Sequence, residues 1–419
     1  MRKPVPSVVG QRCLLAAALC LATFGLLSSC AETPPQGTPD TPSATQPTQS
    51  FAQWRDAFRS QAMAAGISAH TFDAAFAGIE PDDSVVTADG SQPEFTRPIW
   101  QYLEGAVSPA RVRNGQDRLL QNAEALQRID STYGVDREAV MAIWGMESNF
   151  GQQMGNKNVI RSLATLAYEG RRPEFGRDQL IAALQILQHG DVPASNMIGS
   201  WAGAMGQTQF IPTTYNRYAV DFDGDGRRDI WGSSSDALAS TANYLHASGW
   251  QRGQTWGFEV SLPQGFDYAE ADMGIRKPIA EWQRLGVRPV SANQPIAATN
   301  ASLLLPAGHR GPAFLITDNF RAILKYNNST SYALAVGLLA DSFKGGGHLA
   351  GQWPVDEAPL SRSERIELQQ KLMDHGFNPG SVDGIIGANT RQALRSFQKT
   401  ISWPADGYPT QALLMQLRN

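Results

Sequence analysis

One carboxylate, Glu147, lies in a segment whose residue types and spacing could support acid–base chemistry. The segment, residues 135–151, reads VDREAVMAIWGMESNFG. Val140, Ile143 and Trp144 share one face of a helix, and Glu147 is the next residue on that face. Partial desolvation should raise the pKa of Glu147 and let it hold a proton near neutrality. The pattern favours a general acid, while a structural glutamate paired with an arginine or with backbone amides is an equally good interpretation of this helix alone.

A second stretch, residues 199–215, reads GSWAGAMGQTQFIPTTY and is unusually rich in small residues. Small residues would let a polysaccharide approach the backbone closely, with Ser200 and Gln209 as hydrogen-bond donors. The alternative is tight packing by glycine and alanine, which is their more common use. From the residues alone, packing is the favoured interpretation.

A third stretch, residues 221–226, reads DFDGDG and resembles the start of a calcium-binding EF-hand loop. Asp221, Asp223 and Asp225 occupy positions 1, 3 and 5, and the carbonyl of Arg227 falls at position 7. Position 12 is Gly232, where an EF-hand has its bidentate glutamate. A metal-free cluster of Asx turns is the alternative.

The elements that must position these residues are mainly helical. Asp136 is a predicted N-cap for the Glu147 helix, and Gly151 suits its exit. Amphipathic periodicity predicts further helices over residues 51–66, 111–133, 161–169, 178–189, 234–249 and 319–343, the last interrupted near Asn327. Residues 256–263, 287–298 and 303–317 have the character of short strands and loops. We therefore expect a mainly α protein with a small β-containing insert.

The string Met146-Glu147-Ser148-Asn149-Phe150-Gly151, together with AGAMGQTQFIPTTY and Tyr218–Phe222, resembles the lytic murein transglycosylase B family over residues 95–345. The resemblance implies a lysozyme-like α domain with a small β subdomain, and cleavage of the MurNAc–GlcNAc β-1,4 bond of peptidoglycan without water. It identifies Glu147 as the catalytic residue and Asp236 as the residue that closes a structural Ca²⁺ loop with Asp221, Asp223, Asp225 and Arg227. No organic cofactor is expected. The residues that it places along the sugar cleft are Tyr102, Ser200, Gln209, Tyr244, Tyr326, Asn327 and Tyr332.

The resemblance implies a mechanism with a single carboxylate, and no second Asp or Glu has a sequence context that suggests a partner for Glu147. Glu147 would protonate the leaving oxygen, and the MurNAc N-acetyl group would stabilise the anomeric centre. Glu147 would then deprotonate the sugar's own C6 hydroxyl, which attacks C1 to give a 1,6-anhydro product. The alternatives are a hydrolytic muramidase and a non-catalytic peptidoglycan-binding lipoprotein.

The N-terminus has the features of a bacterial lipoprotein signal, residues 1–30. Basic residues precede the apolar run Cys13–Leu27, and Leu27-Ser28-Ser29-Cys30 resembles a lipobox whose cysteine receives lipid. A plain secretory signal is the alternative. Ala31 after the cysteine implies the outer membrane, facing the periplasm of a Gram-negative bacterium. Residues 31–50 form a polar tether rich in Pro, Thr and Gln.

The composition of the chain argues against several classes of function. The 419 residues, 42% hydrophobic and 18% charged, are ample for two or three globular domains. A net charge of -4 makes nucleic acid a poor partner. The three cysteines, Cys13, Cys20 and Cys30, all fall in the predicted signal, so the mature chain would carry no catalytic or zinc-binding thiol.

The C-terminal residues predict a separate small module. A linker over residues 345–360 follows the expected catalytic domain, residues 51–344. Ser361 and Glu364 form a capping box, and the string from Asp383 to Gln398 resembles the peptidoglycan-binding domain of cell-wall enzymes. We expect a compact three-helix module over residues 361–419, with a helical module for another ligand as the alternative.

Overall fold

The computed structural model describes residues 49–90, 97–291 and 300–419. The predicted signal segment, its Cys30 and the tether up to residue 48 lie outside the described residues. In the part of the chain that is described, no helix combines the length and the apolar character needed to cross a membrane.

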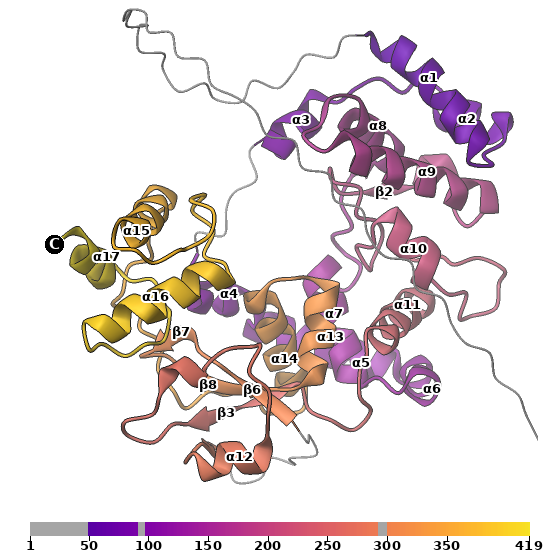
Figure 1. Ribbon diagram of the computed structural model, residues 1–419. Coiled ribbons are helices and arrows are strands. Elements are labelled where there is room, and N and C mark those ends of the chain that lie inside the picture. The colour runs from indigo at the N-terminus through magenta and orange to yellow at the C-terminus, as the bar shows by residue number, and fades with distance from the viewer. Residues whose placement is uncertain (1–48, 91–96, 292–299) are drawn as a thin grey trace, which may run out of the picture. The chain divides into compact units, whose positions relative to one another are not determined.

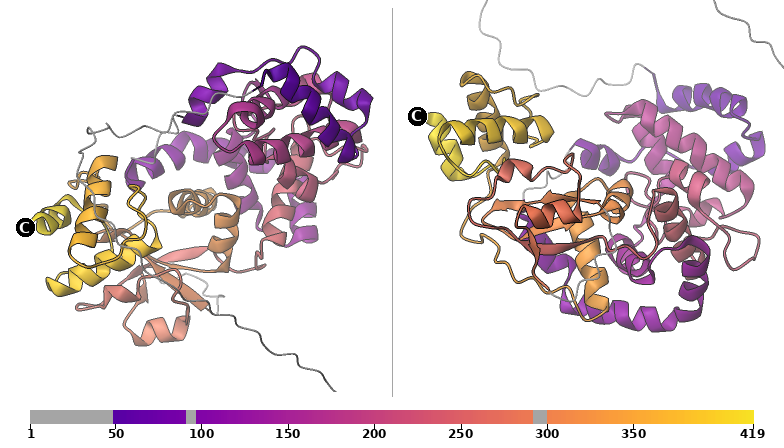
Figure 2. Two further views of the ribbon diagram at one scale, coloured as in Figure 1. Left: turned by 45° about the horizontal axis from the view of Figure 1, so that its top comes forward. Right: turned by 60° about the horizontal axis from the view of Figure 1, so that its bottom comes forward.

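One hydrophobic core joins the N-terminal helices to helices from the middle of the chain, which Figures 1 and 2 show side by side. The first helix begins at a capping box, in which the Ser50 and Gln53 side chains each bind the other residue's backbone N–H. Phe58 and Phe72 are buried in this core against residues of the later helices. The helices of this group are α1 (Phe51–Ala64), α2 (Ala69–Ala75), α3 (Asp83–Gly90), α8 (Val159–Glu169), α9 (Pro173–His189) and α10 (Pro212–Tyr218).

A second core surrounds α7 (Arg137–Ser148), which is the helix predicted around Glu147. Eight of its twelve residues are buried, so its central position is confirmed. Asp136 takes the N-cap position as expected, but its side chain makes no capping hydrogen bond. The helices packed around α7 are α4 (Ile99–Ala106), α5 (Pro109–Gln121), α6 (Ala123–Tyr133), α11 (Ser234–Ala247), α13 (Asp318–Tyr326) and α14 (Thr330–Phe343).

The single helix predicted over residues 111–133 is wrong, because α5 and α6 are separate helices that meet at Asn122. The Asn122 side chain donates to the carbonyl of Arg118 at 2.9 Å. Asparagine side chains compete in this way with the backbone bonds that would continue a helix.

The predicted β-containing insert is a small antiparallel sheet with strand order β4-β6-β8-β3-β5. A third hydrophobic core of the protein lies between this sheet and α12 (Ile279–Arg284). Trp282 of α12 is fully buried and donates to the carbonyl of Ala301 at 3.0 Å. The strands are β3 (Gly257–Ser261), β4 (Lys277–Pro278), β5 (Arg288–Pro289), β6 (Asn300–Leu304) and β8 (Ala313–Ile316), and β7 (Pro306–His309) follows β6. A separate short ribbon joins β1 (Lys157–Asn158) to β2 (Ile198–Gly199).

The C-terminal residues form three helices with a core of their own, as predicted. They are α15 (Arg362–Asp374), α16 (Ala388–Thr400) and α17 (Gln411–Arg418). The capping box of Ser361 and Glu364 is present at the start of α15.

Ion pairs join this module to the sheet region. His309 donates its backbone N–H to Asp406 at 2.9 Å and places Nδ1 2.7 Å from the same carboxylate. Arg395 donates to Asp272 at 2.7 Å and to the carbonyl of Ala271 at 2.6 Å. The module therefore packs against the sheet region through charged contacts.

Candidate active site

Glu147 is near the C-terminal end of α7, and its carboxylate accepts a hydrogen bond from the Tyr332 hydroxyl at 2.6 Å. Burial raises the pKa of Glu147 to about 7, although the Tyr332 hydrogen bond acts in the opposite direction. No second carboxylate among the described residues contributes to this shift. As a whole residue, Glu147 is partly exposed. With a pKa of about 7, Glu147 can hold a proton near neutral pH.

The backbone after α7 leaves the helix through three consecutive residues with positive φ. They are Asn149 at 49°, Phe150 at 59° and Gly151 at 81°. The Phe150 N–H still donates to the carbonyl of Trp144 at 3.2 Å, and its ring meets the Trp144 indole edge-on at 5.7 Å. The Ser148 hydroxyl accepts from the Gly151 N–H at 3.0 Å. These contacts close the end of the helix that carries Glu147.

The four predicted cleft tyrosines are linked to Glu147 by a hydrogen bond, by its charge or through a neighbouring ring. Tyr332 is the one that touches the carboxylate. The charge of Glu147 contributes to raised pKa values of Tyr326 and Tyr102, after burial as the main cause. Tyr244 is one ring further away, with its centroid 5.0 Å from that of Tyr326.

The side chains of the two polar residues predicted as sugar donors both hydrogen-bond to backbone groups. The Ser200 hydroxyl accepts from the Ala202 and Ala204 N–H groups at 3.2 and 3.1 Å. The Gln209 amide nitrogen donates to the carbonyls of Met154 and Gly206 at 3.1 and 2.9 Å. Both side chains thus organise the loop, and a direct contact with sugar stays a prediction for them.

The glycines of residues 199–215 are required by packing at several points. A Cβ at Gly199 would lie 2.1 Å from the carbonyl oxygen of Ala204. A Cβ at Gly206, whose φ is 60°, would lie 2.7 Å from the carbonyl oxygen of Ile230. Close backbone packing therefore explains these glycines, which was the alternative interpretation of this stretch. Asn327, at the end of α13, is exposed, and its predicted role in the cleft stays a prediction.

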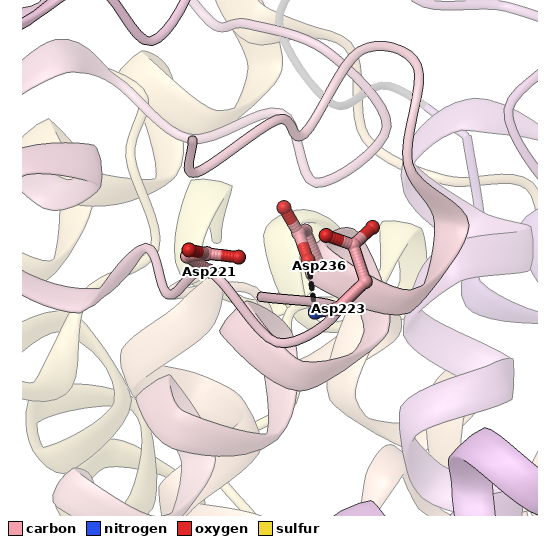
Figure 3. Close-up of side chains that lie close together, drawn as sticks. All are labelled: Asp221, Asp223 and Asp236. Carbon is pink, nitrogen blue, oxygen red and sulfur yellow. Dashed lines mark hydrogen bonds between the residues drawn. The ribbon is translucent and has the colours of Figure 1, made fainter. Parts of the chain in front are cut away.

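The carboxylates of Asp221, Asp223 and Asp236 converge, with one oxygen from each lying within 4.8 Å of the others (Figure 3). Asp236 is fully buried in the first turn of α11 and accepts from the N–H groups of Phe222, Asp223 and Asp229. It therefore closes the loop from the far side. This convergence of oxygens has the chemistry that a calcium ion requires.

Two further predicted ligands are less well placed. Asp225 lies outside this cluster and accepts from the Arg227 N–H at 2.9 Å. That bond is an Asx turn, which the sequence left open as an alternative. The Arg227 carbonyl stays a predicted ligand.

Sequence reasoning missed three residues that hold the end of α7 in place. The indole N–H of Trp144 donates to the side-chain oxygen of Gln207 at 3.0 Å. The Ser148 hydroxyl donates to the backbone carbonyl of Gln207 at 2.8 Å. The one local clue was Ser148 itself, since a serine in the last turn of a helix commonly bonds nearby backbone. Nothing in the sequence pairs it with Gln207, which lies 59 positions further along the chain.

Comparison with known protein families gives two matches. The Transglycosylase SLT domain family matches residues 50–341, and the peptidoglycan binding domain family matches residues 361–417. The chain is 34% identical over 264 residues to the membrane-bound lytic murein transglycosylase B of Escherichia coli, covering 61% of this chain and 70% of that protein.

Solved structures agree with this result. SltB3 from Pseudomonas aeruginosa, in complex with NAG-anhNAM-pentapeptide, is 70% identical with a TM-score of 0.86, and the match covers 88% of this chain and 100% of that one. The Escherichia coli lytic transglycosylase Slt35 in complex with calcium is 30% identical with a TM-score of 0.59, covering 71% of this chain and 93% of that one. The chain belongs to the lytic transglycosylases of the SLT domain family, and it is an enzyme that cleaves peptidoglycan.

Proposed function

We propose that this enzyme cleaves the MurNAc–GlcNAc bond without water and that Glu147 acts first as the acid and then as the base. The observation that carries the proposal is the pKa of Glu147, about 7, in surroundings where no second described carboxylate acts on it. A glycosidase that hydrolyses this bond normally needs two carboxylates, one on each side of it. With one carboxylate, the C6 hydroxyl of the sugar is the nucleophile that requires the least additional machinery.

The proton moves in a closed cycle in this mechanism. Protonated Glu147 donates to the departing glycosidic oxygen as the C1–O bond breaks, and the N-acetyl group supports the anomeric centre. The resulting carboxylate is stabilised by the Tyr332 hydroxyl at 2.6 Å. It then takes the proton of the C6 hydroxyl as the C6 oxygen bonds to C1, which restores the acid.

The products distinguish this mechanism from hydrolysis. Mass spectrometry of digested sacculi is expected to show muropeptides that end in anhydromuramic acid, each lighter by one water than its hydrolysed counterpart. Reducing-end MurNAc as the main product would identify a muramidase. Glu147→Gln should bind glycan strands and release no muropeptides; a scaffold protein would show an unchanged phenotype with this variant.

We further propose that Asp221, Asp223 and Asp236 hold a structural Ca²⁺ ion. Three carboxylates this close repel one another unless a cation is bound. The ion would fix the start of α11, which carries Tyr244, and would take no part in the reaction. Calcium should raise the melting temperature relative to EDTA, and Asp223→Asn should remove the difference. Asp267→Asn, in an exposed turn of the sheet region, is the matched control and should keep it.

The remaining proposals concern where the enzyme acts. We propose that Cys30 carries lipid and anchors the protein to the outer membrane, facing the periplasm, and that residues 361–417 hold it on the wall. Cys30→Ala should move the protein to the soluble periplasmic fraction and abolish labelling with radioactive palmitate. Cys13→Ala and Cys20→Ala, in the same signal, should change neither result. Membrane retention of Cys30→Ala would refute lipid anchoring.

A further inference from the structure

Gln207 is only 6% exposed, and every polar group of this residue makes a hydrogen bond. Its side-chain oxygen accepts from the Trp144 indole at 3.0 Å, and its side-chain nitrogen donates to the carbonyl of Trp231 at 3.1 Å. Its backbone carbonyl accepts from the Ser148 hydroxyl at 2.8 Å, and its backbone N–H donates to the carbonyl of Ile230 at 2.8 Å. Gln207 therefore has no polar group left to bind a substrate.

We propose that Gln207 is a positioning residue for Glu147, because it clamps the last turn of α7 against residues 230 and 231. Trp144 and Ser148 are the residues three before and one after Glu147, so the clamp holds the helix on both sides of the acid. This inference rests on the proposed role of Glu147. It assigns Gln207 the task of keeping that carboxylate against Tyr332 and away from bulk water.

The other side of the clamp is also fixed. Residues 230 and 231 follow Asp229, whose N–H donates to Asp236 at 2.9 Å. Asp236 is the buried member of the carboxylate cluster. The last turn of α7 is thereby connected through Gln207 to the loop that closes at the start of α11.

Gly151 shows how closely the clamp fits. A Cβ at Gly151 would lie 2.8 Å from the side-chain oxygen of Gln207. The left-handed exit from α7 and the Gln207 amide therefore occupy adjoining space. A shift of either one would move the end of the helix, and a misplacement of about 1 Å at a catalytic group can cost up to a hundredfold in rate.

The first test is Gln207→Met, which keeps the length of the side chain and removes both amide hydrogen bonds. We expect kcat to fall about tenfold at a pH where Glu147 is protonated, with KM changed less than twofold, because substrate contacts are untouched. Gln179→Met is the matched control. Gln179 is an equally buried glutamine of α9 that bonds Thr213, and its loss should lower the melting temperature without changing kcat.

A pH profile separates positioning from simple destabilisation. Activity requires protonated Glu147, so it falls as the pH rises through the pKa near 7. The Tyr332 hydroxyl bonds Glu147, and the charge of Glu147 acts on Tyr326 and Tyr102; the pKa values of all three are raised, so none of them titrates in that range. Water that reaches the carboxylate in Gln207→Met should lower its pKa and move the alkaline limb down by about half a pH unit or more. Gln179→Met should not move it.

Trp144→Phe is a second test of the same inference, because it removes the indole donor and leaves Gln207 in place. It should lower kcat in the wild-type background and add nothing further in Gln207→Met. If Gln207→Met does not fold, the kcat and the alkaline limb of Trp144→Phe test the inference on their own. Additive losses, or a kcat within twofold of wild type with an unmoved alkaline limb, would overturn the inference. If Glu147→Gln remained active, the proposed function itself would fail, which is a different result.

Discussion

A carboxylate with a raised pKa lies at each end of α7, yet only one of the two has the surroundings expected of an active site. At the C-terminal end Glu147, with a pKa of about 7, meets the Tyr332 hydroxyl. At the N-terminal end Asp341 of α14, with a pKa raised to about 6 by burial, accepts from the Trp256 indole at 2.9 Å.

Asp341 lies beside Asp136 and Lys344, in a cavity of about 340 Å³. Burial alone therefore raises a carboxylate pKa at either end of the helix. Tyrosine hydroxyls, a closed helix end and the Gln207 clamp are what distinguish Glu147. The following substitutions test this difference.

The largest effect is expected from Glu147→Gln, which removes the proton that the proposed mechanism transfers to the leaving oxygen. We expect kcat to fall about a thousandfold or more, in line with the contribution of general acid–base catalysis. Release of anhydro-muropeptides from purified sacculi measures this loss. Asp136→Asn, at the other end of the same helix, should leave kcat within twofold of wild type.

Tyr332→Phe should have the next largest effect. The hydroxyl stabilises the carboxylate that forms when Glu147 gives up its proton, so its removal should lower kcat about tenfold. The same hydrogen bond lowers the pKa of Glu147, so its loss should move the alkaline limb of activity to higher pH. That direction is opposite to the one expected for Gln207→Met, and a downward shift would contradict this account of the hydrogen bond.

Gly151→Ala should affect both stability and activity. A residue other than glycine at a φ of 81° costs about 1–2 kcal/mol, and the new methyl would also displace the Gln207 side chain. We expect a lower melting temperature and a several-fold lower kcat. Gly253→Ala, at a φ of 74° with open space around the added carbon, should lose a similar amount of stability and no activity.

The smallest effect on activity is expected from Asp341→Asn, with kcat within twofold. Its effect should instead appear in the pH dependence of stability. The folded state raises the pKa of Asp341 from 3.8 to about 6, so it binds this proton more tightly than the unfolded chain does. Stability should therefore fall as the pH rises from about 4 to 6, by about 1–3 kcal/mol, and the variant should lack this fall. Denaturant unfolding at pH 4 and pH 7 measures it.

The sequence predicted well those features that depend on neighbouring residues. Apolar spacing located the Glu147 helix, and the capping box at Ser361 located the start of α15. The break at Asn122 was missed because α5 and α6 each continue the same amphipathic pattern. Whether a helix continues through one asparagine is decided by packing, which a linear pattern does not contain.

In the active site too, features set by neighbouring residues were predicted and contacts between distant residues were not. Glu147 was predicted from its own helix. Tyr332, 185 positions away, was expected in the cleft only from family resemblance, and its contact with Glu147 was not predicted. Gln207 was not predicted, since its partners are brought together by the fold. The small residues of positions 199–215 carried two interpretations, and the backbone contacts of Gly199 and Gly206 support the packing one.

The left-handed exit at residues 149–151 has a consequence for motion. Helix ends normally fray, and the last residues of a helix exchange their amide hydrogens readily. Here the bonds from Phe150 to Trp144 and from Gln153 to Ser148 secure the turn that carries Glu147. The acid is thus held by a stiff stretch of main chain before any glycan arrives, and substrate binding need not order it.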